Sequence, residues 1–247
     1  MNIKIEIEYE GTDYVGWQKQ ASGKSIQGEL EACLQIIFKK KISIYVAGRT
    51  DAGVHALGQV AHFEVENCQI NPAKIYQAIN AYLYKSKNKI IVKSSTKKDE
   101  GFHARFSAKS RIYEYKIFNK KVQSPFINKR MWFVPQKLDL LSMKKASEYL
   151  IGMHDFNAFR SKYCQAKSSI RSIEDINISK KQFGVTITFK AKSFLHNQVR
   201  IMVGTLVNIG RNFWSVSKIK SILDSKDRKN AGKTAPPYGL YLKKVSY

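Results

Sequence analysis

The stretch ISIYVAGRTDAGVHALGQVAHFEV, residues 42–65, contains two strand patterns joined by a loop. Apolar residues dominate both of its ends, so we expect strands at 42–46 and 59–65. Two glycines in the loop permit backbone angles that other residues avoid, and a cation, a hydroxyl and a carboxylate lie between them: Arg49, Thr50 and Asp51. A simple turn capped by Asp51 and a rigid catalytic loop both fit this composition.

The elements around this loop follow a recognisable order. Apolar periodicity predicts helices at 26–37 and 72–83, and strands at 3–9, 42–46, 59–65 and 89–94. Ser25 is expected to cap the first helix, and Pro72 to begin the second. The order strand, helix, strand, strand, helix, strand is typical of the split βαβ, or ferredoxin-like, plan.

The second half of the chain repeats this order. We expect helices at 143–150, 196–209 and 217–223, and strands at 111–118, 173–178, 183–189 and 240–245. The predicted fold class is therefore α+β, with two ferredoxin-like (split βαβ, RRM-like) halves, 1–104 and 105–247. We expect their antiparallel sheets to pack side by side with the helices on one face. Because no Gly/Ser linker separates the halves, we also expect a basic cleft between them that binds the substrate.

Charge is the strongest global signal. The 247 residues include 43 Lys and Arg against 19 Asp and Glu, a formal net charge of +24. Such an excess attracts polyanions, and nucleic acid is the first candidate. A lysine-rich coding bias is the alternative explanation, but one cluster mixes basic and aromatic residues, as phosphate contact and base stacking require: Arg105, Phe106, Lys109, Arg111, Tyr113, Tyr115 and Lys116.

Several function classes are disfavoured. The start of the chain alternates charged and apolar residues and lacks the apolar core of a signal peptide, and no apolar run reaches membrane-spanning length. We therefore expect a cytoplasmic protein without a membrane partner. The three cysteines are widely spaced, and the five histidines lack ligand spacing, so no metal site is expected. Walker and nucleophile-elbow patterns do not occur, and no cofactor is expected.

The loop sequence Gly48–Ala56 closely resembles the signature of the tRNA pseudouridine synthase A (TruA) family. Six further blocks agree with the family in the expected order: Glu8–Gln18, Gly58–Phe63, Phe102–Tyr115, Gly152–Phe159, Phe194–Arg200 and Ala231–Leu240. One departure is visible at 84–88, where the family usually has a proline and a short turn. The resemblance covers nearly the whole chain, and it favours a catalytic loop over a simple turn.

The resemblance implies an isomerase that converts uridine to pseudouridine at positions 38 to 40 of the tRNA anticodon stem-loop. It also implies a homodimer with the substrate bridging both subunits, and no cofactor. Asp51 would be the essential carboxylate. It either adds to the uracil ring or the sugar as a nucleophile or removes a ribose proton as a base.

Three substrate-binding residues follow from the same resemblance. The target base must leave the RNA stack, and Arg49 would fill the vacated space or hold the phosphate of the flipped nucleotide. Tyr113 would stack on the uracil, and Arg200 would pair with Asp51 and keep it ionised. Further RNA contacts are expected at four positions: His55, Arg105, Lys109 and Arg111. For His55, support of the loop or a role as acid or base are the alternatives to a phosphate contact.

Two other functions compete with this hypothesis. A non-catalytic tRNA-binding module or chaperone would use the basic and aromatic residues, but it would leave the Asp51 loop without a purpose. A metal-dependent nuclease would need clustered acids, and this chain has few. Modification of tRNA would indicate the synthase, cleavage would indicate the nuclease, and binding alone would indicate the non-catalytic module.

Overall fold

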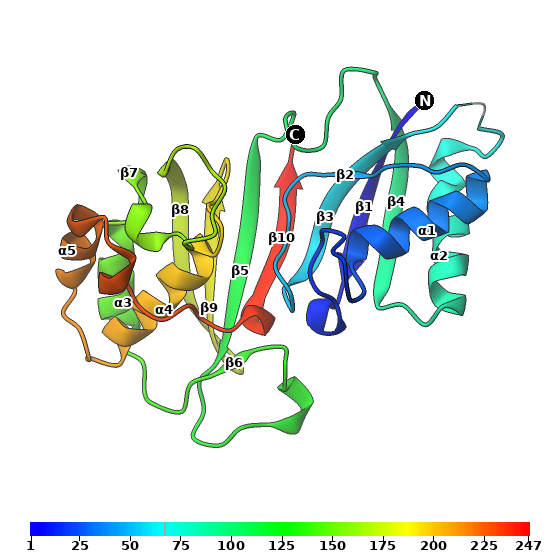
Figure 1. Ribbon diagram of the computed structural model, residues 1–247. Coiled ribbons are helices and arrows are strands. Elements are labelled where there is room, and N and C mark those ends of the chain that lie inside the picture. The colour runs from blue at the N-terminus through cyan, green and yellow to red at the C-terminus, as the bar shows by residue number, and fades with distance from the viewer. Residues whose placement is uncertain (67) are drawn as a thin grey trace. The chain divides into compact units, whose positions relative to one another are not determined.

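The computed structural model describes residues 1–66 and 68–247. It confirms the α+β class and divides the chain into two compact units (Figure 1). The first comprises Met1–Lys109 together with Tyr241–Tyr247, and the second comprises Ser110–Leu240. Residues Tyr241–Tyr247, which were expected in the second half of the chain, thus belong to the first unit.

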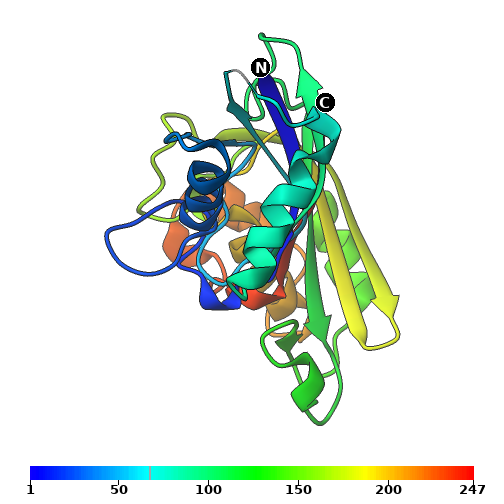
Figure 2. The same ribbon diagram turned by 90° about the vertical axis from the view of Figure 1, so that its right-hand side faces the viewer.

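The first unit is a sheet covered on one face by two helices (Figures 1 and 2). Its strands are β1 (Asn2–Tyr9), β2 (Tyr45–Val46), β3 (His55–Glu64), β4 (Ile90–Lys98) and β10 (Leu240–Ser246). Their order is β4-β1-β3-β10. β10 pairs with the first residues of β3, and β2 pairs with β3 at Ala61 and His62. The β1–β3, β1–β4 and β2–β3 pairs are antiparallel, whereas β10 runs parallel to β3.

Alternation along β1 explains why the helices cover only one face. Its apolar side chains are buried toward α1 (Ile26–Phe38) and α2 (Ile75–Lys85), whereas Lys4, Glu6 and Glu8 keep some exposure. The predicted cap of α1 is confirmed, because the Ser25 hydroxyl accepts a hydrogen bond of 3.1 Å from the Gly28 amide. The Asn71–Pro72 start is a 3-10 turn that leads into α2.

The strands that flank the loop carrying Asp51 differ from the expected bounds. β2 is shorter than 42–46, and β3 begins at His55 rather than at residue 59. The earlier start has a tertiary cause, since His55 and Ala56 pair with Tyr241 and Leu242 of β10. The local pattern of apolar residues cannot show a partner that lies so far along the chain.

The second unit has the strand order β5-β9-β8-β7, in which neighbouring strands are antiparallel. The strands are β5 (Ser110–Phe118), β6 (Trp132–Phe133), β7 (Gly152–Asp155), β8 (Ile170–Lys181) and β9 (Gly184–Ala191). β6 pairs with β5 in parallel. The helices are α3 (Leu140–Glu148), α4 (Gln198–Gly210) and α5 (Lys218–Ser225). β6 and β7 were not predicted, and the predicted strand residue Phe183 instead precedes β9.

The described residues also include six short 3-10 helices: Gly11–Asp13, Pro72–Lys74, Pro125–Ile127, Asn157–Phe159, Arg228–Asn230 and Pro237–Gly239. Within the residues described here, no helix is both long enough and apolar enough to cross a membrane.

Backbone packing fixes α4 against the segment that follows residue 230. A Cβ added at Gly204 would overlap the Lys233 carbonyl oxygen. The Gly232 amide donates to the Thr205 hydroxyl at 2.9 Å, and the Ala235 amide donates to the Arg200 carbonyl at 3.1 Å. This contact holds the first turn of α4, and with it the backbone of Arg200.

Candidate active site

The Asp51 loop is held by backbone hydrogen bonds to a second loop, which we call the supporting segment (residues 10–17). The Trp17 amide donates to the Thr50 carbonyl at 3.0 Å. The Gly53 amide, at φ +76°, donates to the Tyr14 carbonyl at 3.4 Å. These bonds lie on the two sides of Asp51, so they fix the backbone that carries its carboxylate.

Thr50 points inward and anchors the loop through its side chain. Its hydroxyl lies 2.7 Å from the Tyr9 hydroxyl, which also accepts from Gln59 Nε2 at 3.3 Å. Gln59 Nε2 donates to the Gly48 carbonyl at 2.7 Å as well. All three side chains are buried, and burial raises the pKa of Tyr9 to about 12. The phenol therefore stays neutral and able to hydrogen-bond at ordinary pH.

Exposure alternates along the next residues of the loop. Arg49 is exposed, Thr50 is buried and Asp51 is partly exposed. The Val54 amide donates to the Asp51 carbonyl at 3.2 Å, which closes the turn. Buried anchors therefore hold in place an aspartate that is itself partly exposed, and an arginine lies two residues before it.

Glycine is required where the supporting segment meets the loop. Gly16 has φ +109°, and a Cβ there would lie 2.8 Å from the Thr50 carbonyl oxygen. A Cβ at Gly11 would overlap the Val54 carbonyl oxygen. Only residues without a side chain allow the two backbones to approach this closely.

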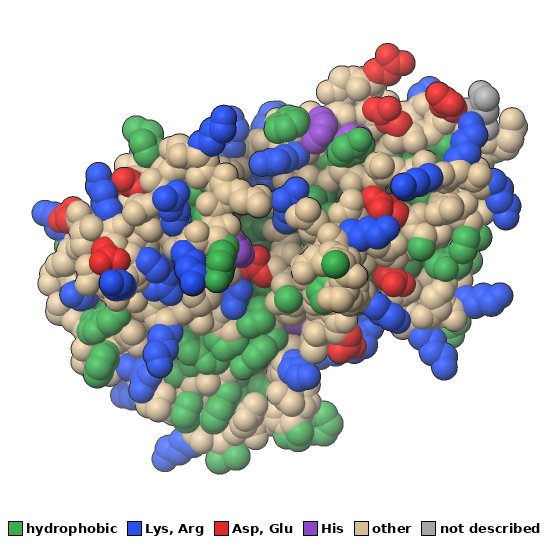
Figure 3. Space-filling view, in the orientation of Figure 1, with side chains coloured by type: hydrophobic (Ala, Val, Ile, Leu, Met, Phe, Trp, Pro, Cys, Tyr) green, Lys and Arg blue, Asp and Glu red, His purple; other side chains and the backbone are tan. Residues whose placement is uncertain are grey.

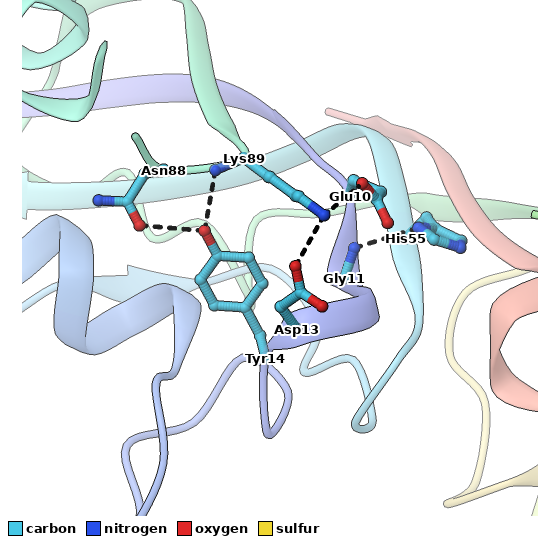
Figure 4. A network of polar contacts seen from close by, with 7 residues as sticks. All are labelled: Glu10, Gly11, Asp13, Tyr14, His55, Asn88 and Lys89. Carbon is cyan, nitrogen blue, oxygen red and sulfur yellow. Dashed lines mark hydrogen bonds and ion pairs between the residues drawn. The ribbon is translucent and has the colours of Figure 1, made fainter. Parts of the chain in front are cut away.

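His55 helps to hold the supporting segment in place. Its side chain is buried, and Nδ1 accepts a hydrogen bond of 3.1 Å from the Gly11 amide (Figure 4). The ring stacks on Tyr241 at a centroid distance of 4.7 Å. The hydrogen bond to Gly11 is in keeping with the expected support of the loop, and an RNA contact by His55 stays a prediction, one that the burial of the ring disfavours.

The candidates Tyr113 and Arg200 lie in the second unit. Tyr113 is buried on β5, on the same face as Tyr115 as predicted, and its ring meets Phe194 edge-on at 5.3 Å. Arg200 is partly exposed in the first turn of α4. Its Nε donates to the Ala235 carbonyl and its Nη1 to Asn197 Oδ1, each at 2.8 Å. Both contacts restrict the direction of its guanidinium.

The remaining expected RNA contacts differ in exposure. Arg105 and Lys109 are exposed, and the Arg105 guanidinium lies 5.6 Å from the centroid of the Phe106 ring. Arg111 is buried and donates to the Lys192 carbonyl at 2.5 Å. An RNA contact by Arg111 stays a prediction, one that this burial disfavours. Other Lys and Arg side chains are spread widely over the face seen in Figure 3.

The structure thus groups Arg49, Asp51 and His55 in the first unit, and Tyr113 and Arg200 in the second. Among the residues it describes, no three His, Cys, Asp or Glu side chains are grouped so that they would hold a metal ion.

Comparison with known proteins identifies the family. A family model described as tRNA pseudouridine synthase matches residues 5–107 and 146–247. The chain belongs to the tRNA pseudouridine synthase family. Proteins named tRNA pseudouridine synthase A are similar to it over the full length of both chains, with 47% identity in Neorickettsia sennetsu, 47% in Ehrlichia canis and 45% in Wolbachia pipientis.

Family membership confirms the resemblance inferred from the sequence blocks. The ranges matched to the pseudouridine synthase family include Arg49, Asp51 and Arg200, whereas Tyr113 lies between them. The relatives align over the whole chain and therefore span that gap.

Sequence reasoning missed the residues that support the loop of this pseudouridine synthase. Tyr9 and Tyr14 fall in the block Glu8–Gln18 and Gln59 in the block Gly58–Phe63, but the sequence indicated no role for them in holding the loop. Their roles arise from contacts such as the Tyr9–Thr50 pair, which joins residues 41 positions apart. Their place in the blocks that resemble the family was the sequence signal for them.

Proposed function

We propose that this chain isomerises uridine to pseudouridine in the anticodon stem-loop of tRNA, at positions 38 to 40, with Asp51 as the catalytic carboxylate. One observation carries the proposal: in a member of this family, the backbone on both sides of Asp51 is fixed while the residue stays partly exposed. A preorganised carboxylate of this kind suits a reaction in which one group must meet a flipped nucleotide.

The reaction requires no redox partner. The bond between uracil N1 and ribose C1′ breaks, the base turns, and a bond forms between C5 and C1′. The C5 proton is lost to a base or solvent and N1 regains one, so substrate and product are isomers. Asp51 acts either as a nucleophile toward the substrate or as the base for a ribose proton, and the proposal leaves both routes open.

The other candidates receive substrate-binding roles. Arg49, the exposed neighbour of the anchored Thr50, fills the space of the flipped base or holds its phosphate. Tyr113 stacks on the uracil. Arg200 binds the substrate through a guanidinium that is oriented by hydrogen bonds to Ala235 and Asn197. Arg105 and Lys109 contribute phosphate contacts, which their exposure supports.

The charge of the chain supports tRNA as the partner, since +24 favours a polyanion. We further propose that the protein acts in the cytoplasm as a homodimer. Light scattering and cross-linking in the presence of tRNA test the dimer independently of catalysis.

The decisive experiment incubates unmodified tRNA with the protein and maps pseudouridine. We expect modification at positions 38 to 40. Asp51→Ala and Asp51→Asn should lower the single-turnover rate by roughly 10⁴-fold or more while tRNA binding changes little. Asp224→Asn, at an exposed acid on α5, is the control and should keep full activity.

Each other outcome names a different function. Cleavage of the tRNA would support a nuclease, and binding without modification would support a non-catalytic module. Full turnover by Asp51→Ala would remove Asp51 from the mechanism.

A further inference from the structure

The supporting segment is itself held by the turn between α2 and β4 (Figure 4). The Tyr14 hydroxyl donates to Asn88 Oδ1 and accepts from the Lys89 amide, each at 3.0 Å. Asn88 Nδ2 donates to Glu29 Oε2 at 2.8 Å. Asn88 therefore links Tyr14 to helix α1 through a single side chain.

Lys89 adds an ionic connection to the same segment. Its Nζ lies 2.7 Å from Asp13 Oδ2 and 3.2 Å from Glu10 Oε2. The pairing with Asp13, and then with Glu10, raises the pKa of Lys89, so the charge persists at alkaline pH. The Glu10 amide also donates to the Lys89 carbonyl at 3.0 Å. Both ends of the 3-10 turn at 11–13 are thus attached to this turn.

Tyr14 is the point at which these attachments reach the Asp51 loop. Its side chain is 6% exposed, and its hydroxyl is bound by the α2–β4 turn. Its carbonyl accepts the hydrogen bond from Gly53. Burial raises the pKa of Tyr14, which keeps the hydroxyl protonated as a donor to Asn88. A shift of Tyr14 would therefore move the backbone two residues from the carboxylate.

The sequence resemblance assigns no role to this attachment. Asn88 ends the stretch 84–88, in which the chain departs from the usual family pattern. Its side chain makes two hydrogen bonds at the base of the supporting segment, and neither partner belongs to α2 or β4.

We propose that Tyr14 and Asn88 are positioning residues that set the placement of Asp51, a role that rests on the proposed function of that carboxylate. The hydroxyl of Tyr14, held by Asn88 and Lys89, fixes the Tyr14 carbonyl. That carbonyl fixes Gly53 and thereby the turn that carries Asp51. The proposed role is exerted through these contacts within the protein and requires no contact with the substrate.

A matched pair of variants tests the proposal. Asn88→Ala removes two side-chain hydrogen bonds, one with the Tyr14 hydroxyl and one with Glu29, which together link Tyr14 to α1. Asn80→Ala also removes two, to the Val92 carbonyl and amide at 2.8 Å each, but these connect only α2 with β4. We expect Asn88→Ala to lower kcat on tRNA by roughly tenfold, as a small misplacement of a catalytic group does, with KM nearly unchanged. Asn80→Ala should lower stability and leave kcat unchanged.

Hydrogen exchange supplies a readout that does not depend on activity. The Gly53 amide, which donates to the Tyr14 carbonyl, should exchange several-fold faster in Asn88→Ala than in Asn80→Ala. Tyr14→Phe should reproduce the effects of Asn88→Ala. The double variant should be no slower in catalysis than Tyr14→Phe, because both changes break one connection.

Equal kcat values in Asn88→Ala and Asn80→Ala, or unchanged exchange at Gly53, would overturn the positioning role. If Asn88→Ala does not fold, Tyr14→Phe gives the same comparison with its ring packing retained. A wild-type protein that forms no pseudouridine would instead overturn the proposed function, and hydrogen exchange would still test the connection itself.

Discussion

The hydroxyl oxygens of Tyr9 and Thr50 lie 2.7 Å apart in the interior of the first unit. The pair joins β1, at the centre of that sheet, to the residue that precedes Asp51. Because both groups are buried, their hydrogen bond cannot be replaced by water without opening the fold. The position of the loop is therefore coupled to the stability of the sheet.

Thr50→Val tests this coupling. Valine preserves the shape but leaves the Tyr9 hydroxyl without that partner, so the free energy of unfolding should fall by about 1–2 kcal/mol. Urea unfolding measures this change, and single-turnover kinetics should show a slower reaction. Thr188→Val, on β9 of the second unit, is the control. Identical stability and rate in Thr50→Val and the wild type would show that the pair does not hold the loop.

The alkaline limit of stability should depend on Tyr9. Burial raises its pKa from the ordinary value near 10 to about 12, so the folded state binds the phenolic proton more tightly than the unfolded chain. This contribution is complete below about pH 10 and is lost as the pH rises toward about 12. Urea midpoints should therefore fall across that window.

Tyr9→Phe provides the comparison for the alkaline measurement. The variant has no proton to lose at this position, so its midpoint should fall less steeply with pH than that of the wild type. Part of the decline should remain, because burial also raises the pKa of Tyr115 and of Cys33. Parallel pH curves for the two proteins would contradict the assignment to Tyr9.

Gly204→Ala should be destabilising even though alanine favours helices. Helix propensity would gain about 1 kcal/mol, but the new Cβ would overlap the Lys233 carbonyl, and such overpacking costs about 1–3 kcal/mol or more. We expect a net loss in thermal unfolding experiments. Gly210→Ala, at the last residue of the same helix, is the comparison: its Cβ would crowd the Met143 and Leu138 side chains rather than a backbone carbonyl, so side-chain shifts should relieve more of the overlap. An equal effect at both sites would argue against the rigid contact.

The salt dependence of tRNA binding should distinguish exposed basic residues from the buried Arg111. Each phosphate contact that is lost should reduce the slope of log K against log salt by about 1. We therefore expect smaller slopes for Arg105→Ala and for Lys109→Ala. Arg111→Ala should lower stability without changing the slope, because the guanidinium is buried against the Lys192 carbonyl. A reduced slope for Arg111→Ala alone would reverse this distinction.

Local patterns predicted the parts of the fold that depend on neighbouring residues. Alternation of isoleucines gave the buried face of β1, and Ser25 gave the start of α1. The bounds of β3 were wrong because its first residues are fixed by a partner strand near the end of the chain. β7 has only four residues, Gly152–Asp155, which is too few for periodicity to detect.

The candidate site shows the same difference between local sequence patterns and long-range contacts. A compact motif identified Arg49, Thr50 and Asp51, because these residues are adjacent in sequence. The connection between Tyr14 and Asn88 joins residues 74 positions apart, and nothing in either local sequence indicates it. Burial of His55 and Arg111 likewise follows from tertiary packing, which residue type alone does not determine.

The return of the chain to its first unit affects how the protein is made. Tyr241 and Leu242 are the parallel partners of His55 and Ala56, and the whole second unit lies between them in the sequence. A ribosome that synthesises the chain from its amino terminus makes the Asp51 loop early and the strand beside it late. A nascent or prematurely terminated chain lacks that strand, so the loop acquires its final support only after the second unit has been translated.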